Sequence, residues 1–283
     1  MRERLVVSVC LATLVVAAAS AGAATAPPTV LVIGDSVATG MYWHDDAIAV
    51  VQQNLGVYWD VAVCRTIDGT SCPFDGERAP TLIQVVSSFG KVPPTVVVEV
   101  GYNDPVDTFA TEVDHAMSAL TAAGATHVLW LTMRAARDPY PILNGLLEDA
   151  QAKWPQLELV DWNTYSENQP SWFQTDLVHL TPEGGLAMAH LVHAAVIQVV
   201  DPLRVRATPL LLQAKKSYAT KLLAQGGTPP YRWRIASGRP PRGFHLLANG
   251  TLTTTASATA RATLMLSVMD ADGATASVQV LER

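Results

Sequence analysis

The stretch TVLVIGDSVATG, residues 29–40, decides the fold. Residues 30–33 are a continuous run of branched apolar side chains, which is typical of a parallel strand covered on both faces. Gly34 ends this strand, and Asp35 and Ser36 follow at its carboxyl end, where open α/β sheets bind ligands. A serine at that position can act as a nucleophile or can cap the next helix, and the stretch alone leaves both interpretations open.

Strand and helix patterns alternate on both sides of this stretch up to residue 200. Further strands are predicted at residues 56–63, 95–100, 127–133 and 157–162, and helices at residues 41–55, 81–89, 109–123, 142–154 and 183–200. Residues 64–80 and 163–180 are predicted to be loops. The alternation predicts a three-layer α/β/α fold with a parallel sheet, and five strands suit the flavodoxin-like order 2-1-3-4-5.

The composition changes near Arg204. Residues 204–283 are rich in Gly, Pro and Thr, lose the helical period and contain several alternating strand patterns. They predict a small β-sandwich that follows an α/β domain at residues 27–203. Asp270 and Asp272 in this tail fit a hairpin turn, with a calcium site as the alternative.

The whole-chain composition limits the classes of function. The 283 residues are 49% hydrophobic and 16% charged, enough for a sizeable core and unlike a disordered chain. The formal net charge is −6 and there is no basic stripe, which argues against nucleic acid as a partner.

The amino-terminal residues predict export. A short charged start, an apolar run at residues 5–19 and small residues up to position 23 have the order of a signal peptide over residues 1–23. An uncleaved membrane anchor is the alternative. Cys64 and Cys72 are then an even pair in an exported chain, and we expect them to form a disulfide. The predicted location is secreted or cell-surface.

Four side chains at predicted loops can act together. Ser36 is the candidate nucleophile, His179 can take its proton, and Asp176 can hold the imidazole in the required tautomer. Asn103 follows the third strand, so its side-chain amide can hold a developing oxyanion together with the backbone N–H of Ser36. The pattern predicts nucleophilic acyl chemistry.

These residues carry a family resemblance. Gly34-Asp35-Ser36, Gly101-x-Asn103-Asp104 and Asp176-x-x-His179 resemble the first, third and fifth blocks of the SGNH (GDSL-type) hydrolases, over about residues 29–200. The resemblance implies an ester hydrolase with Ser36, Asp176 and His179 as the catalytic triad and no metal or other cofactor. It also implies oxyanion donors from Ser36, Asn103 and a glycine of the second block, for which Gly69 is the candidate, with a plain turn glycine as the alternative.

Finer features narrow the resemblance. The stretches CRTIDGTSC and VDWNTYS…DLVHLTPEG resemble exported SGNH domains found with acyltransferases of cell-surface polysaccharides, which implies an acylated glycan as substrate. Arg65 belongs to that pattern as a substrate-binding residue, with a salt bridge on the loop as the alternative. The tail resembles Ig-like, cadherin-like modules and is expected to contact the cell surface.

The expected function is therefore an exported serine esterase that hydrolyses acyl, above all O-acetyl, esters. One alternative is an O-acyltransferase that uses the same triad, since both reactions pass through an acyl-enzyme. The other is an inactive surface-binding protein with the same fold.

Overall fold

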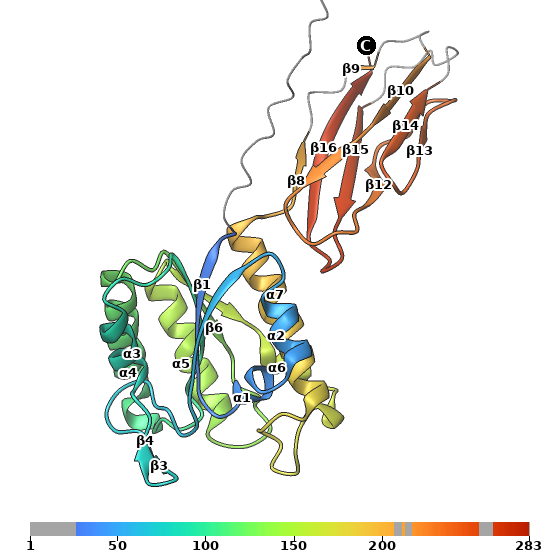
Figure 1. The fold of residues 1–283 in the computed structure, drawn as a ribbon. Coiled ribbons are helices and arrows are strands. Elements are labelled where there is room, and N and C mark those ends of the chain that lie inside the picture. The colour runs from blue at the N-terminus through green and yellow to red at the C-terminus, as the bar shows by residue number, and fades with distance from the viewer. Residues whose placement is uncertain (1–26, 207–210, 213–216, 255–262, 283) are drawn as a thin grey trace, which may run out of the picture.

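A computed structural model describes residues 27–206, 211–212, 217–254 and 263–282, and Figure 1 shows its fold. The predicted signal peptide, residues 1–23, lies outside the described residues.

Five parallel strands form the central sheet. They are β1 (Thr29–Gly34), β2 (Gly56–Val61), β5 (Thr95–Glu99), β6 (His127–Leu131) and β7 (Leu157–Val160). Their order in the sheet is β2-β1-β5-β6-β7, which is the flavodoxin-like order and confirms the sequence prediction. Every residue of β5 is buried, as expected for a central parallel strand covered on both faces.

Helices cover both faces of this sheet (Figure 1). They are α1 (Thr39–Tyr42), α2 (Asp45–Val51), α3 (Leu82–Phe89), α4 (Val106–Ala122), α5 (Tyr140–Lys153), α6 (Trp162–Ser166) and α7 (Pro182–Val200). Helix α4 packs between α3 and α5, whereas α7 packs on α1 and α2. Helix α7 is apolar and long enough to cross a membrane, but it lies against the sheet and its inner face joins the core.

The structure corrects several predicted boundaries. The helix predicted at residues 41–55 is two helices, α1 and α2, because the chain turns at Trp43 and is extended at His44. Helix α4 begins at Val106 after Pro105, one turn earlier than predicted. The predicted loop at residues 64–80 contains a small hairpin of β3 (Pro73–Phe74) and β4 (Glu77–Arg78), and the loop at residues 163–180 contains most of α6 and a 3₁₀ turn at Pro170–Trp172.

Glycines bring the start of α7 close to the turn after β1. A Cβ at Gly185 would lie 1.9 Å from the backbone oxygen of Gly40, so only glycine fits at this contact between α7 and α1. Thr181 caps α7 by accepting a hydrogen bond from the N–H of Gly184, as predicted. The residues just before α7 therefore lie beside the carboxyl end of β1.

Small, mainly antiparallel sheets form the tail. Their strands are β8 (Arg204–Arg206), β9 (Leu211–Leu212), β10 (Tyr218–Lys221), β11 (Leu223–Gln225), β12 (Arg232–Ser237), β13 (His245–Leu246), β14 (Thr251–Thr254), β15 (Thr263–Met269) and β16 (Thr275–Glu282). They form three sheets, β10-β14-β13, β11-β8 and β12-β15-β16-β9, which enclose a separate hydrophobic cluster around Trp233 and Leu266. The predicted β architecture is confirmed, and the Ig-like resemblance stays a prediction.

The tail follows the carboxyl end of α7, away from the loops at the carboxyl edge of the sheet (Figure 1). The 19 residues of α7 span about 28 Å. The turn after β15 approaches the middle of α7, where Asp272 lies 3.9 Å from the ring of His193. In this turn the Asp270 carboxylate accepts hydrogen bonds from the N–H groups of Thr228, Asp272 and Ala274, as the hairpin interpretation predicts.

Candidate active site

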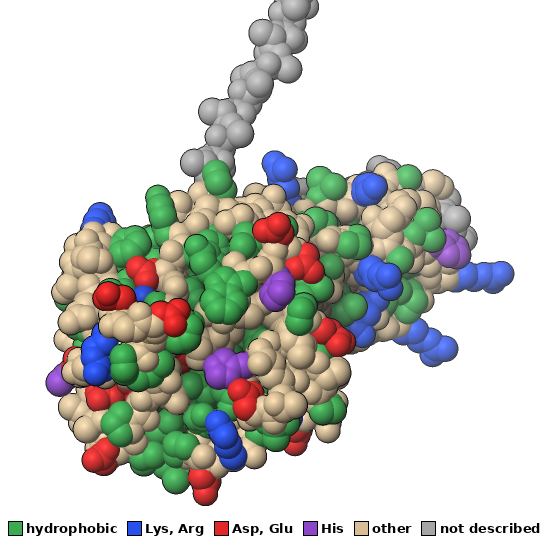
Figure 2. Space-filling model, turned by 60° about the horizontal axis from the view of Figure 1, so that its bottom comes forward, with side chains coloured by type: hydrophobic (Ala, Val, Ile, Leu, Met, Phe, Trp, Pro, Cys, Tyr) green, Lys and Arg blue, Asp and Glu red, His purple; other side chains and the backbone are tan. Residues whose placement is uncertain are grey.

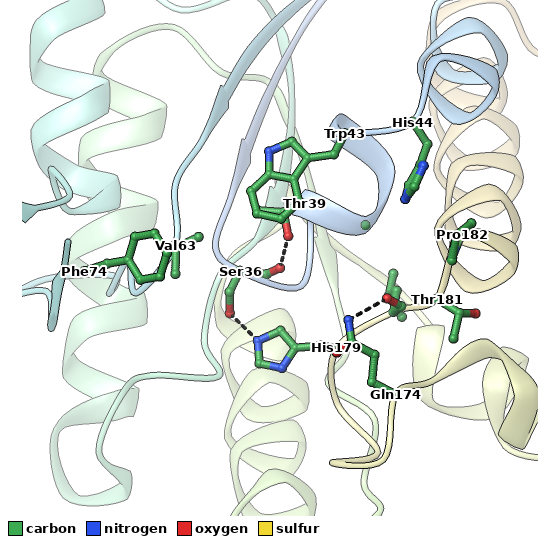
Figure 3. A pocket seen from close by; sticks show the side chains of 12 residues that line it. Ser36, Thr39, Trp43, His44, Val63, Phe74, Gln174, His179, Thr181 and Pro182 are labelled. Carbon is green, nitrogen blue, oxygen red and sulfur yellow. Dashed lines mark hydrogen bonds between the residues drawn. The ribbon is translucent and has the colours of Figure 1, made fainter.

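Ser36, His179 and Asp176 lie in a line of hydrogen bonds at the carboxyl edge of the sheet. The Ser36 Oγ is 3.0 Å from His179 Nε2, and His179 Nδ1 is 2.6 Å from Asp176 Oδ2. Figure 3 shows the first of these bonds, with Ser36 on the turn after β1 and His179 on the loop before α7. With Nδ1 protonated toward Asp176, Nε2 is free to accept the serine proton. The arrangement therefore has the geometry of a nucleophile, a base and an orienting carboxylate.

A tight turn builds the His179 side of this line. The Asp176 Oδ1 accepts hydrogen bonds from the N–H groups of Val178 and His179, while Leu177 adopts a left-handed conformation with φ of 62°. Burial disfavours the charged form of Asp176, but its hydrogen bonds from the His179 ring and from the two N–H groups outweigh burial and lower its pKa. The carboxylate thus stays ionised beside the imidazole.

A buried pair of carboxyl groups holds the Ser36 turn. Asp35 Oδ1 accepts the N–H of Val37 at 2.9 Å, and Glu99 Oε2 accepts the N–H of Ala38 at 3.0 Å. The N–H of Asp35 also donates to the backbone oxygen of Glu99. The residues on both sides of Ser36 are therefore fixed by two side chains that are almost fully buried. Glu99 was not among the site residues predicted from the sequence.

Both carboxyl groups have raised pKa values because both are buried. Burial raises the pKa of Asp35 to about 6, although hydrogen bonds from the backbone and from Glu99 partly offset the rise. Burial, together with the neighbouring Asp35 charge, raises the pKa of Glu99 well above its usual range. The raised pKa favours the protonated form of Glu99, which can donate a hydrogen bond to Asp35. The only sequence signal for this pair is one acidic residue in the apolar strand TVVVEV.

Asn103 lies on the turn after β5, next to the Ser36 turn. Its side-chain Nδ2 donates to the backbone oxygen of Arg65 at 3.0 Å, which uses one of its two protons. The preceding residue, Tyr102, donates its N–H to Asp35 Oδ2 at 3.4 Å, which joins the turns after β1 and β5. Among the described residues the backbone N–H of Ser36 has no hydrogen-bond partner, so both proposed oxyanion donors have a free proton.

For Gly69 and Arg65, the other two candidate site residues, the structure favours the alternative interpretations. Gly69 is exposed and its N–H donates to the Asp68 carboxylate at 2.7 Å, so its geometry favours a plain turn glycine. The Arg65 guanidinium is 1% exposed and bonds to the Asp60 carboxylate and to the backbone oxygens of Asp60 and Pro80. This arrangement favours the salt-bridge alternative, because a buried guanidinium with protein partners has no donor facing the solvent.

The predicted disulfide between Cys64 and Cys72 is present. It closes the loop after β2, and the β3–β4 hairpin follows it directly. Arg78 on β4 also donates to the backbone oxygen of Ser71. The bridge and this hydrogen bond hold the base of the hairpin, which carries Phe74 toward Ser36.

A pocket of about 590 Å³ opens at Ser36 and His179, a size usual for small-molecule sites. Figure 2 views the end of the molecule with this pocket and shows hydrophobic side chains gathered near histidines there. Trp43 and Phe74 line the pocket together with His44 (Figure 3). The remaining lining residues are Thr39, Gly40, Val63, Gln174, Leu180, Thr181 and Pro182.

Two aromatic residues of the loop between α6 and α7 do not face the pocket. Trp172 stacks on Trp162 with ring centroids 5.9 Å apart, and Phe173 lies under the guanidinium of Arg134 at 3.8 Å. Neither ring lines the pocket, and both pack with the hydrophobic core of the α/β part.

Comparisons with known proteins give one sequence match of limited extent. No protein-family model matches the chain. A region of 116 residues is 28% identical to the O-acetyltransferase OatA of Staphylococcus aureus and covers 41% of this chain. The match spans only 18% of that relative, less than a fifth of its length.

Solved structures are similar to about three fifths of this chain. Est24, a carbohydrate acetylesterase from Sinorhizobium meliloti, is 15% identical with a TM-score of 0.44, over 60% of this chain and 98% of that chain. The aryl esterase of M. smegmatis is 14% identical with a TM-score of 0.45, over 61% of this chain and 100% of that chain. The fold of this chain follows from its own sheet order, to which such low scores add nothing.

Proposed function

We propose that this protein is an exported serine esterase in which Ser36 is the nucleophile, His179 the general base and Asp176 the residue that orients it. The observation that carries the proposal is the pair of hydrogen bonds, 3.0 Å and 2.6 Å long, that joins these three side chains beside an open pocket. The sheet order and the three sequence blocks at its carboxyl edge agree with the SGNH-hydrolase resemblance.

The reaction has two steps. The Ser36 Oγ attacks the ester carbonyl carbon while its proton passes to His179 Nε2, and the alcohol then leaves with that proton. A water molecule next gives a proton to His179 and attacks the acyl-enzyme, which releases the carboxylic acid and restores Ser36. The N–H of Ser36 and the side-chain amide of Asn103 stabilise the oxyanion in both steps.

The proposed substrate is an O-acyl, above all O-acetyl, ester of a carbohydrate. The name of one similar protein supports this class, since the relative matched over 116 residues is an O-acetyltransferase. The match to the O-acetyltransferase also supports a second candidate function, acyl transfer, in which a sugar hydroxyl replaces water in the second step.

The proposed setting is outside the cytoplasm. The disulfide supports an oxidising compartment, and the composition of residues 1–23 supports a signal peptide. Residues 27–203 would then form the hydrolase domain, and residues 204–283 a second domain that keeps the enzyme near a cell-surface glycan.

The test is hydrolysis of p-nitrophenyl acetate by the purified protein and by its Ser36→Ala variant. We expect Ser36→Ala to lower kcat by several orders of magnitude, because members of a triad act as a unit. A fluorophosphonate probe should label the wild-type protein at Ser36 and should not label the variant.

Ser87→Ala is the matched control, because Ser87 is an exposed serine on α3 outside the pocket. It should keep wild-type activity and labelling. A Ser36→Ala protein that keeps near-normal turnover and labelling would contradict the proposal.

A further inference from the structure

Two exposed aromatic side chains flank the candidate nucleophile. Trp43 is 66% exposed at the end of α1, and Phe74 is 50% exposed on the hairpin after the disulfide loop. Both line the pocket that holds Ser36 and His179, and Figure 3 shows Trp43 over the Ser36 turn with Phe74 to one side. Large aromatic rings are usually well buried, so an exposed pair beside a reactive serine indicates a surface that receives a ligand.

In the described part of the chain, the exposed ring of Trp43 has no aromatic or hydrogen-bonded partner. Trp43 makes no aromatic contact and no side-chain hydrogen bond there, whereas its neighbour Tyr42 packs on Trp59 with ring centroids 5.6 Å apart. The indole of Trp43 thus keeps a free apolar face and a free N–H donor. A ligand that covers this face would bury apolar area that the fold itself leaves in water.

The opposite side of the pocket is polar. His44 and Gln174 lie there, and Gln174 uses its Nε2 to hold the backbone oxygen of Leu180, which leaves its Oε1 free to accept. None of the described residues that line the pocket is Asp, Glu, Lys or Arg. The lining therefore suits a ligand with one apolar face, several hydroxyl groups and no net charge.

We propose that Trp43 and Phe74 form a subsite for a neutral sugar ring, the alcohol portion of the ester, whose apolar C–H face packs on Trp43. The proposal rests on the esterase function above and narrows its substrate to an uncharged acetylated glycoside. A long acyl chain is a poorer fit, because rings this exposed cannot enclose it.

The experiment compares ethyl acetate with mono-O-acetylated methyl glucosides and with the corresponding glucuronides. Ethyl acetate contains no ring, so its hydrolysis reports on the triad alone. We expect Trp43→Ala to raise KM for the acetylated glucosides about tenfold, the scale of one lost aromatic contact, with kcat changed less than twofold. Hydrolysis of ethyl acetate should change far less than hydrolysis of the acetylated glucosides, and the wild type should prefer the glucosides to the glucuronides.

Two further variants separate the ring contact from a structural effect. Trp43→Phe should restore most of the affinity, because it keeps a flat apolar face. Tyr58→Ala is the matched control, because Tyr58 is an aromatic residue 55% exposed on β2 that packs near Phe89 and does not line this pocket. It should leave all three substrates unaffected.

The inference is overturned if Trp43→Ala leaves KM for the acetylated glucosides unchanged or lowers ethyl acetate hydrolysis equally. It is also overturned if the wild type prefers glucuronides, or if Trp43→Ala instead raises KM for long-chain acyl esters of ethanol. A wild-type protein that hydrolyses none of the esters would overturn the esterase proposal itself, so the two failures are distinguishable.

Discussion

The α/β part and the tail bury ionisable side chains for different purposes. In the α/β part Asp35, Glu99 and Asp104 are buried at or near the carboxyl edge of the sheet, around the turns that carry Ser36 and Asn103. In the described residues of the tail Asp270 is the one buried ionisable side chain, and its carboxylate ties together the turn after β15. Burying a carboxyl group costs free energy, so its position shows where a fold needs a fixed backbone. One region fixes a reactive turn, and the other fixes a connection between strands.

The largest effect that this comparison predicts is a loss of kcat on substitution of Asn103. We expect Asn103→Ala to lower kcat by about 10² to 10³, the scale for losing one oxyanion donor, with little change in KM. The measurement is steady-state hydrolysis of p-nitrophenyl acetate.

The matched control removes an asparagine of the tail. Asn249→Ala deletes only a hydrogen bond to the N–H of Thr251 and should leave kcat at the wild-type value. If both substitutions lower kcat alike, or if Asn103→Ala changes only KM, the contrast between the two regions fails.

A smaller effect is expected on the pH dependence of stability. Glu99 has a raised pKa in the folded protein, so above the unfolded pKa of about 4.3 the folded state binds more protons than the unfolded state. The free energy of unfolding therefore falls as pH rises, until the folded-state pKa of Glu99 is passed. Glu99→Gln removes this proton but keeps an acceptor for the N–H of Ala38, so it should flatten the fall.

Urea unfolding of the wild type and of Glu99→Gln at pH 5 and pH 8 measures this difference. If the stability of the Glu99→Gln protein falls with pH as steeply as that of the wild type, the raised pKa of Glu99 is not the cause of the fall.

The smallest effect is expected from removing the tail. Truncation after Leu203 spares all of α7, and Ser36 and His179 lie at the opposite end of that helix. Hydrolysis of p-nitrophenyl acetate should stay within about twofold of the full-length rate, while activity on an acetylated polymeric glycan should fall, because a tethered domain raises local concentration.

The truncated protein loses the contact of Asp272 with His193, so its folding is checked by thermal unfolding. Unfolding of the truncated chain, or an equal loss on both substrates, would make the tail part of the catalytic fold and end the two-domain proposal.

Much of the α/β part could be predicted from local sequence. Apolar runs of β-branched residues alternate with helical periods, so the strand order follows from the pattern and from the short, right-handed connections of such sheets. The β3–β4 hairpin was not predicted because its strands are exposed and have two residues each, which is too short to show an alternating pattern of apolar residues. The break between α1 and α2 was not predicted because Trp43 is compatible with a helix.

The site was only partly predictable for a related reason. Sequence blocks place Ser36, Asp176 and His179 on adjacent loops, but they do not say where a side chain points. Arg65 turns inward because Asp60, five residues earlier at the end of β2, offers it a carboxylate, and the spacing of the two residues does not show that the arginine points into the protein. Trp43 and Phe74 come together only through the fold and the disulfide.

The contact between Gly40 and Gly185 also limits how this protein can change through mutation. Any side chain at position 185 would strike the backbone of α1, and a Cβ at Gly40 would lie 2.6 Å from the Cβ of Leu180. In a library of random variants selected for esterase activity, positions 40 and 185 should therefore retain only glycine. Gly69, where a Cβ would meet no atom within 4 Å, should tolerate asparagine, which accepts a left-handed backbone. The tolerance of each glycine is thus set by the space around it more than by its distance from Ser36.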